Sequence, residues 1–115
     1  MWAGKPNDFY SQPVVMLIGP RSLSATDVFA ETFHSIRRGK LIGEPTAGST
    51  GDPLAFALPG GGTGRVATST DVGEGLIGRG VQPDVLVPRT VQDLLAGRDA
   101  ALEAGIAELR SSLGR

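Results

Sequence analysis

The chain has 115 residues, 40% of them hydrophobic, and a formal net charge of −1. This length is typical of one domain with a modest core, and the near-neutral charge argues against nucleic acid or an anionic membrane as partner. With no cysteine and one histidine, disulfides and thiolate sites are excluded, and we expect no metal or other cofactor. The longest apolar run, residues 14–18, is too short for membrane insertion, and residues 1–12 do not resemble a signal peptide.

The first part of the chain alternates strand and helix patterns. Residues 1–12 have no period and are predicted to form an entry loop to an apolar strand at 13–19. After a short turn, a helix is expected from about Ala25, followed by a strand at 40–43 that is parallel to the first strand if the helix is a crossover. The apolar residues of this helix recur at helical spacing and are Ala25, Val28, Phe29, Phe33 and Ile36.

The second part of the chain predicts a hairpin and two C-terminal helices. The expected elements are a loop at 44–52, strands at 54–58 and 65–72 around a turn at 59–62, a strand at 85–87, and helices at 90–96 and 98–112. The last helix carries a stripe of Leu102, Ile106 and Leu109. No repeat and no interdomain linker is found, so the sequence predicts a single α/β domain.

Ser24 is the main candidate for chemistry because it lies where the first strand passes into the first helix. The first N–H groups of a helix have no partner within it, so a nucleophile and oxyanion donors could come from one turn of chain. Ser24 and Asp27 also have the spacing of a capping box, in which the serine only satisfies backbone donors. The local pattern leaves both interpretations open and favours capping.

Three other apparent motifs lack the residues or spacing that their chemistry needs. The glycine pattern at 73–78 matches a dinucleotide-binding fingerprint by letter, but residues 79–83 cannot begin the helix that such a site needs. Ser24 lacks the flanking glycines of the α/β-hydrolase nucleophile elbow. His34 lies ten residues along the same helix, about 15 Å away at 1.5 Å per residue, and faces away from the apolar stripe. We expect His34 to be solvated and not to act as a base for Ser24.

Three blocks in order give the chain a family resemblance. Residues 13–27, with Ser24 as the middle serine of a Ser-Ala-Ser-Ala-Ser-Glu-like turn, resemble the nucleophile segment of the C-terminal processing (tail-specific) and tricorn-core serine peptidases. Residues 41–48 are similar to the second strand and Gly-Glu-x-Thr-x-Gly loop of that family. Residues 78–85 are similar to its Gly-x-Gly-Ile-x-Pro-Asp block. Together these blocks make a catalytic reading of Ser24 stronger than the capping one.

The resemblance implies a ClpP/crotonase-like fold, with a mixed sheet, a crossover helix that carries the nucleophile, and C-terminal helices. It implies Ser24 as nucleophile, the Ala25 N–H as an oxyanion donor, and a substrate-binding loop containing Thr46, Gly48 and Ser49. The partners would be a peptide or protein substrate and an upstream part of the same catalytic domain. An extracytoplasmic or cell-envelope location also follows from the resemblance alone.

The chain departs from the family pattern at the general base. Processing proteases carry a lysine in the loop after the second strand, and Ser49 stands there; neither Lys5 nor Lys40 fits that role. The tricorn-like branch uses an upstream histidine and a glutamate, and the place of that glutamate is taken by Ile77. The remaining carboxylates near the motifs, Asp27 and Glu74, are weak candidates.

We therefore interpret residues 1–115 as the C-terminal half of a serine peptidase catalytic domain, with an entry loop at 1–12 and C-terminal helices at 90–115. Alone, this segment is expected to be inactive because it lacks the upstream base. Two alternatives stay open: a non-catalytic relative that serves as a binding or scaffold module, and a structural module in which Ser24 only caps the helix.

Overall fold

The computed structural model describes residues 9–68 and 75–114. Its centre is a parallel three-stranded sheet in the order β1-β2-β5, formed by β1 (Val15–Ile18), β2 (Lys40–Gly43) and β5 (Val85–Leu86). Helix α1 (Ala25–Ser35) is the crossover between β1 and β2, whose register pairs Val15 with Lys40 and Ile18 with Gly43. The predicted strand, helix and second strand are thus confirmed, and the turn that carries Ser24 lies at the carboxyl end of β1.

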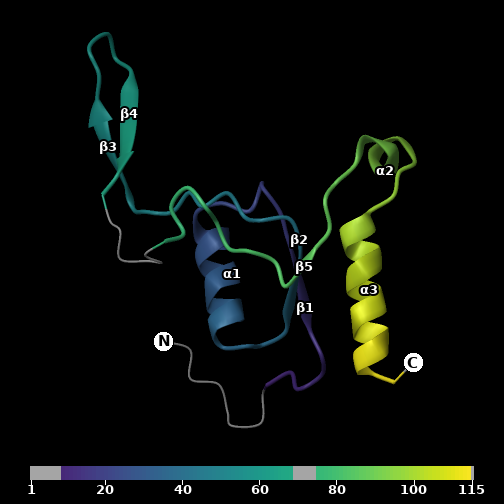
Figure 1. Cartoon of the computed structure of the whole chain (residues 1–115). Helices are drawn as coiled ribbons and strands as arrows, with labels where there is room; N and C mark the ends of the chain where they lie inside the picture. Colours follow the sequence, from purple (N-terminus) through teal and green to yellow (C-terminus); the bar gives the residue numbers. More distant parts are fainter. Residues whose placement is uncertain (1–8, 69–74, 115) are drawn as a thin grey trace.

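The antiparallel hairpin forms a sheet of its own. Strands β3 (Pro53–Ala57) and β4 (Thr63–Ala67) pair with each other and extend away from the parallel sheet (Figure 1). The second strand was expected to run to Val72, of which residues 69–72 lie outside the described part. The hairpin buries little of its surface, and Leu54 and Phe56 remain about half exposed.

Two C-terminal helices follow β5, namely α2 (Val91–Leu95) and α3 (Ala100–Ser112). Helix α3 packs against β1 and β2, on the side of the sheet opposite α1 (Figure 1). It approaches closely because Gly105 is buried there, and a Cβ at this position would lie 3.0 Å from the Leu17 side chain. The face of α3 that contains Gly105 therefore contacts the sheet. Leu102 and Ile106 of the expected apolar stripe stay 47% and 41% exposed.

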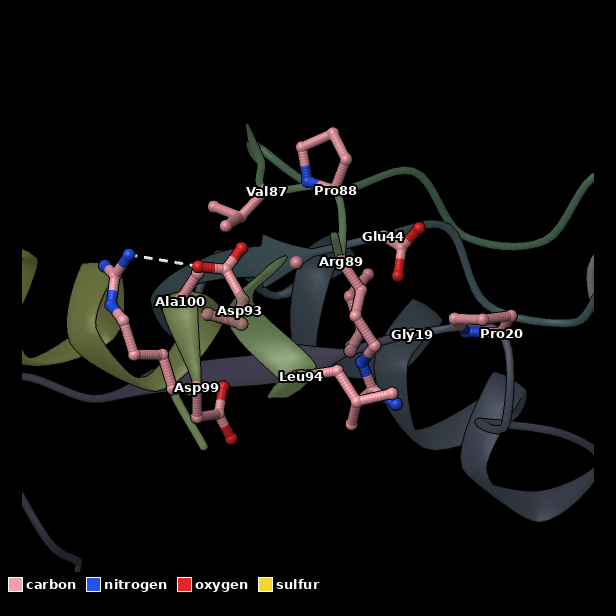
Figure 2. A pocket seen from close by; sticks show the side chains of 14 residues that line it. Gly19, Pro20, Glu44, Val87, Pro88, Arg89, Asp93, Leu94, Asp99 and Ala100 are labelled. Atoms are coloured by element: carbon pink, nitrogen blue, oxygen red, sulfur yellow. Dashed lines mark hydrogen bonds and ion pairs between the residues drawn. The ribbon is translucent and has the colours of Figure 1, made fainter. Parts of the chain in front are cut away.

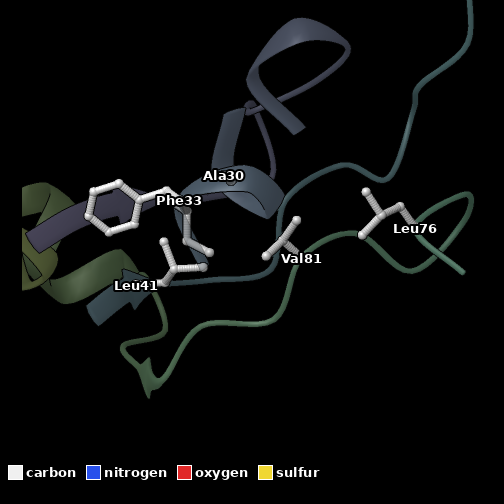
Figure 3. Packing of buried hydrophobic residues seen from close by; sticks show 6 residues of the cluster. Ala30, Phe33, Leu41, Leu76 and Val81 are labelled. Carbon is white, nitrogen blue, oxygen red and sulfur yellow. The ribbon is translucent and has the colours of Figure 1, made fainter. Parts of the chain in front are cut away.

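The core lies between α1, β2 and the segment before β5 (Figure 3). Its buried apolar side chains are Ile18, Ala30, Phe33, Leu41, Leu76 and Val81. Helix α1 turns Asp27, Ala30 and Phe33 inward, while Phe29 and Ile36 are 61% and 65% exposed. Of the apolar residues at helical spacing in α1, Phe33 alone is buried, and an apolar stripe is left on the outer face.

The described chain is less compact than an ordinary domain of this length. The radius of gyration is 17.8 Å, against about 13 Å for a globular domain of this size. Projecting elements and one-sided packing account for the difference. The α/β class is confirmed, with parallel and antiparallel pairing in two separate sheets. Among the described residues, no helix is long and apolar enough to cross a membrane.

Candidate active site

Ser24 has a backbone conformation that non-glycine residues rarely adopt. Its φ of 56° and ψ of −119° differ from the extended conformation usual at a helix N-cap. Such conformations cost roughly 1–3 kcal/mol and persist only where the surroundings impose them. Ser24 and Asp27 form a capping box, in which the Ser24 side chain faces the Asp27 N–H and the Asp27 carboxylate accepts from the Ser24 N–H, although the contact of the Ser24 side chain falls short of full hydrogen-bond geometry. Ser24 itself is exposed to solvent.

Backbone hydrogen bonds hold the turn around Ser24 in place. The Ser24 N–H donates to the Asp27 carboxylate at 2.9 Å and to the Ser49 carbonyl at 2.9 Å. The Ala47 N–H donates to the Ser22 carbonyl at 2.8 Å. The loop after β2 therefore lies directly against the serine turn, and its contacts explain how the positive φ of Ser24 is sustained.

Asp27 is the centre of this arrangement, and it is fully buried. Its carboxylate accepts hydrogen bonds from the N–H groups of Gly48 and Ser49, both at 3.0 Å, in addition to that of Ser24. Burial acts to raise the pKa of Asp27, but the hydrogen bonds from the Thr46 side chain and the three backbone N–H groups outweigh it, so the pKa is lowered. An ionised carboxylate with a lowered pKa is a poor general base near neutral pH.

The loop residues Thr46 and Gly48 connect this cluster to the segment before β5. The Thr46 hydroxyl accepts from the Val81 N–H at 2.7 Å, and the Thr46 N–H donates to the Val81 carbonyl at 3.1 Å. Gly48 has φ +64°, and a Cβ there would overlap the backbone of Gly80. The three sequence blocks that carry the resemblance are thus joined in space, and Thr46 and Gly48 are buried while Ser49 is exposed.

A cavity of about 240 Å³ opens beside Ser24. It lies between the serine turn, the loop after β2 and the base of the hairpin, and its lining residues are Leu23, Ser24, Ser49, Thr50, Gly51, Pro53, Arg65, Val66 and Ala67. Ala25 is the first residue of α1, and its N–H donates to no other described residue. The Ser24 hydroxyl, the candidate nucleophile, and a helix N–H without a partner among the described residues therefore lie at one end of an open cavity.

A second cavity, of about 210 Å³, lies at the carboxyl ends of β1 and β2 (Figure 2). Its lining includes Gly19, Glu44, Arg89 and Asp93, but neither Ser24 nor Ser49. Asp93 is engaged by the Arg98 guanidinium at 3.0 Å. Because this cavity contains no candidate nucleophile, we place the candidate active site at the Ser24 cavity.

The other residues considered as bases lie elsewhere or outside the described part. His34 is at the far end of α1, where its Nε2 lies 3.7 Å from the Asp84 carboxylate. Lys40 pairs with Glu108 at 2.8 Å on the opposite side of the sheet from α1. Glu74 and Lys5 are outside the described residues. No histidine or lysine is among the described residues that line the Ser24 cavity.

Sequence reasoning missed two features of this site. It treated Asp27 as a first-turn carboxylate, whereas the side chain is buried and binds a distant loop. It also did not single out Arg65, which the hairpin brings to the Ser24 cavity. The glycine at 48 was the available signal for the first, since a buried carboxylate needs backbone N–H groups that can approach closely. No local sequence pattern indicated that Arg65 would lie at the Ser24 cavity.

Comparison with known proteins shows which family the chain belongs to. The profile of peptidase family S41 matches residues 3–87, which include Ser24, the loop after β2 and β5. The chain belongs to peptidase family S41. Helices α2 and α3 lie beyond the matched range.

One curated relative and two solved structures illustrate what the chain is similar to. A carboxy-terminal-processing protease of Bartonella bacilliformis is 29% identical over 105 residues, covering 89% of this chain and 24% of the relative. The crystal structure of the tricorn protease superposes with a TM-score of 0.76 at 26% identity, covering 90% of this chain and 11% of that one. A putative peptidase from Parabacteroides merdae gives a TM-score of 0.68 at 29% identity, covering 87% and 32%. The chain thus spans a third or less of the length of each of these proteins.

The Asp27 cluster predicts a specific pH dependence of stability. Because the folded-state pKa is lowered, ionised Asp27 stabilises the fold above the unfolded-state pKa of about 4. This contribution is lost as pH falls through the lower folded-state value. We expect Asp27→Asn to lower the free energy of unfolding at pH 7 by about 3 kcal/mol, since the charge is lost and one acceptor oxygen becomes an NH2 group that faces backbone donors. The variant should also lose less stability than the parent protein between pH 5 and 2.

Urea unfolding monitored by circular dichroism across this pH range measures both effects. Asp99→Asn is the matched control, because Asp99 caps α3 through a bond to the Leu102 N–H and asparagine caps equally well. An Asp27→Asn variant as stable as Asp99→Asn at pH 7 would contradict the role assigned to the Asp27 carboxylate.

Proposed function

We propose that this chain forms the C-terminal half of a serine peptidase catalytic domain, in which Ser24 attacks the scissile carbonyl of a peptide or protein substrate. The observation that carries the proposal is the strained backbone of Ser24, imposed by hydrogen bonds that leave its hydroxyl exposed. Strain of this kind concentrates at functional sites. A residue that served only as a helix cap would be expected in the ordinary extended backbone conformation.

The proposed reaction is acyl transfer. As the Ser24 hydroxyl attacks, its proton passes to a general base, and the negative charge that forms on the carbonyl oxygen is stabilised by the Ala25 N–H and the positive end of α1. The base then returns the proton to the leaving amine, and water repeats the sequence to release the acyl group. Ser24, Ala25 and the Ser49 side of the cavity belong to this chain, and we assign the base and the second oxyanion donor to an upstream part of the catalytic domain.

Three observations support the division into two halves. The chain covers at most 32% of the length of each of the three relatives. Phe29 and Ile36 leave an apolar stripe exposed on α1. The Ser24 cavity has no histidine or lysine among its described lining residues. The third observation also favours a second candidate, a binding module that keeps the fold without catalysis. A histidine or lysine reaching Ser24 from upstream chain distinguishes the two.

The nucleophile assignment is tested by substitution in the full-length protein. Ser24→Ala should reduce the hydrolysis of a fluorogenic peptide by at least about 1,000-fold in kcat. It should lower the free energy of unfolding by no more than about 2 kcal/mol, because only the capping contact of the Ser24 side chain with the first turn of α1 is lost. Ser22→Ala is the matched control, two residues away in the same turn, and should retain most activity. An active Ser24→Ala variant would refute the assignment.

Residues 1–115 alone should be catalytically inactive. A serine hydroxyl is a weak nucleophile without an adjacent base, and His34 is held at the opposite end of α1. A fluorophosphonate probe should therefore label this segment no faster than its Ser24→Ala variant, as measured by intact-mass spectrometry. Labelling that depends on Ser24 would show that a base within the segment, such as Asp27 or Glu74, activates the serine.

A further inference from the structure

Among the described residues that line the cavity beside Ser24, one has a charged side chain. Of its nine lining residues, eight are apolar, glycine or hydroxyl-bearing, and the ninth is Arg65 on β4. Arg65 is exposed, and none of the ion pairs between described residues involves it. The guanidinium is therefore open to a carboxylate, to which it can bind with two parallel hydrogen bonds.

No carboxylate is among the described residues that line the cavity with Arg65. The buried Asp27 carboxylate is occupied by three backbone N–H groups and is not among the lining residues. Asp52, the neighbour of Gly51 and Pro53, does not line the cavity either. The N-terminal end of the eleven-residue helix α1 adds positive partial charge beside Ser24. The described lining of the cavity therefore favours a negatively charged group.

Residues 65–67 of β4 line the cavity, and no other described strand pairs with the outer edge of β4. The Leu58 N–H donates to the Gly62 carbonyl and the Thr68 N–H to the Asp52 carbonyl, which fixes the alternation of hydrogen-bonded pairs along the hairpin. By this alternation, the backbone N–H and C=O groups of Gly64 and Val66 form hydrogen bonds with β3. The backbone N–H and C=O groups of Arg65 and Ala67 point away from β3. An extended chain could therefore pair with β4 at these two residues, next to Ser24.

We propose that Arg65 is a specificity-determining residue that selects substrates with a carboxylate within a few residues of the scissile bond. The substrate strand pairs with the free edge of β4, and Arg65 binds an aspartate or glutamate side chain, or the carboxylate that ends the substrate chain. This inference rests on the proposed function, because Ser24 defines where the scissile bond lies.

The experiment uses the full-length protein and matched internally quenched peptides built on one cleaved sequence. Each position from three residues before the scissile bond to three after it carries Glu, Gln or Lys in turn, and a further set compares a free with an amidated C-terminus. We expect kcat/KM for Glu, or for the free carboxylate, to exceed that of its neutral counterpart by about fivefold or more at one position. The two peptide sets distinguish a side-chain carboxylate from a terminal one.

Arg65→Gln should remove this preference, and Arg65→Glu should invert it in favour of Lys. Arg110→Gln is the control, because Arg110 is exposed on α3 and does not line the cavity. The same preference measured as Kd, with the Ser24→Ala variant and fluorescent peptides, requires no turnover. Preference in binding without Ser24-dependent hydrolysis would sustain the inference and refute the proposed function. Equal affinities for all peptides, or a preference that survives Arg65→Gln, would overturn the inference.

Discussion

The buried carboxylate of Asp27 is the interaction on which the rest of this structure depends. A charged group without solvent is costly unless every lone pair has a donor, and here three backbone N–H groups and the Thr46 hydroxyl supply them. The donors come from two separate segments, the turn after β1 and the loop after β2. One side chain thus joins the carboxyl ends of two neighbouring parallel strands, and satisfying its charge fixes both segments.

The geometry of the candidate nucleophile follows from this constraint. Asp27 binds the Ser24 N–H from within the helix, the Ser49 carbonyl binds it from the loop, and the backbone between them takes a positive φ. The exposed stripe on α1 and both faces of the two-stranded hairpin are surfaces that the described residues leave uncovered.

Much of the fold could be predicted from the sequence, because its signals are local. Periodicity and glycine placement located α1, β2, the hairpin and α3 within a few residues, and three ordered blocks identified the family. Which face of a helix is buried was harder to predict from the sequence. Phe29 and Ile36 match the helical period, yet Asp27 and Ala30 are buried in their place. A burial pattern that includes a carboxylate depends on donors twenty residues away, which periodicity does not contain. The position of Arg65 depends likewise on how the hairpin leaves the loop.

The role of Asp27 in positioning Ser24 is tested most directly by mapping where a serine-directed probe binds covalently in the full-length protein. After reaction with a fluorophosphonate, tandem mass spectrometry of the digested protein should locate one stoichiometric adduct on Ser24. The reaction rate should fall when Asp27→Asn relaxes the turn, even under conditions in which that variant remains folded. An adduct on Ser22 or Ser49, or a rate unaffected by Asp27→Asn, would contradict the claim that the Asp27 carboxylate positions Ser24 as the nucleophile.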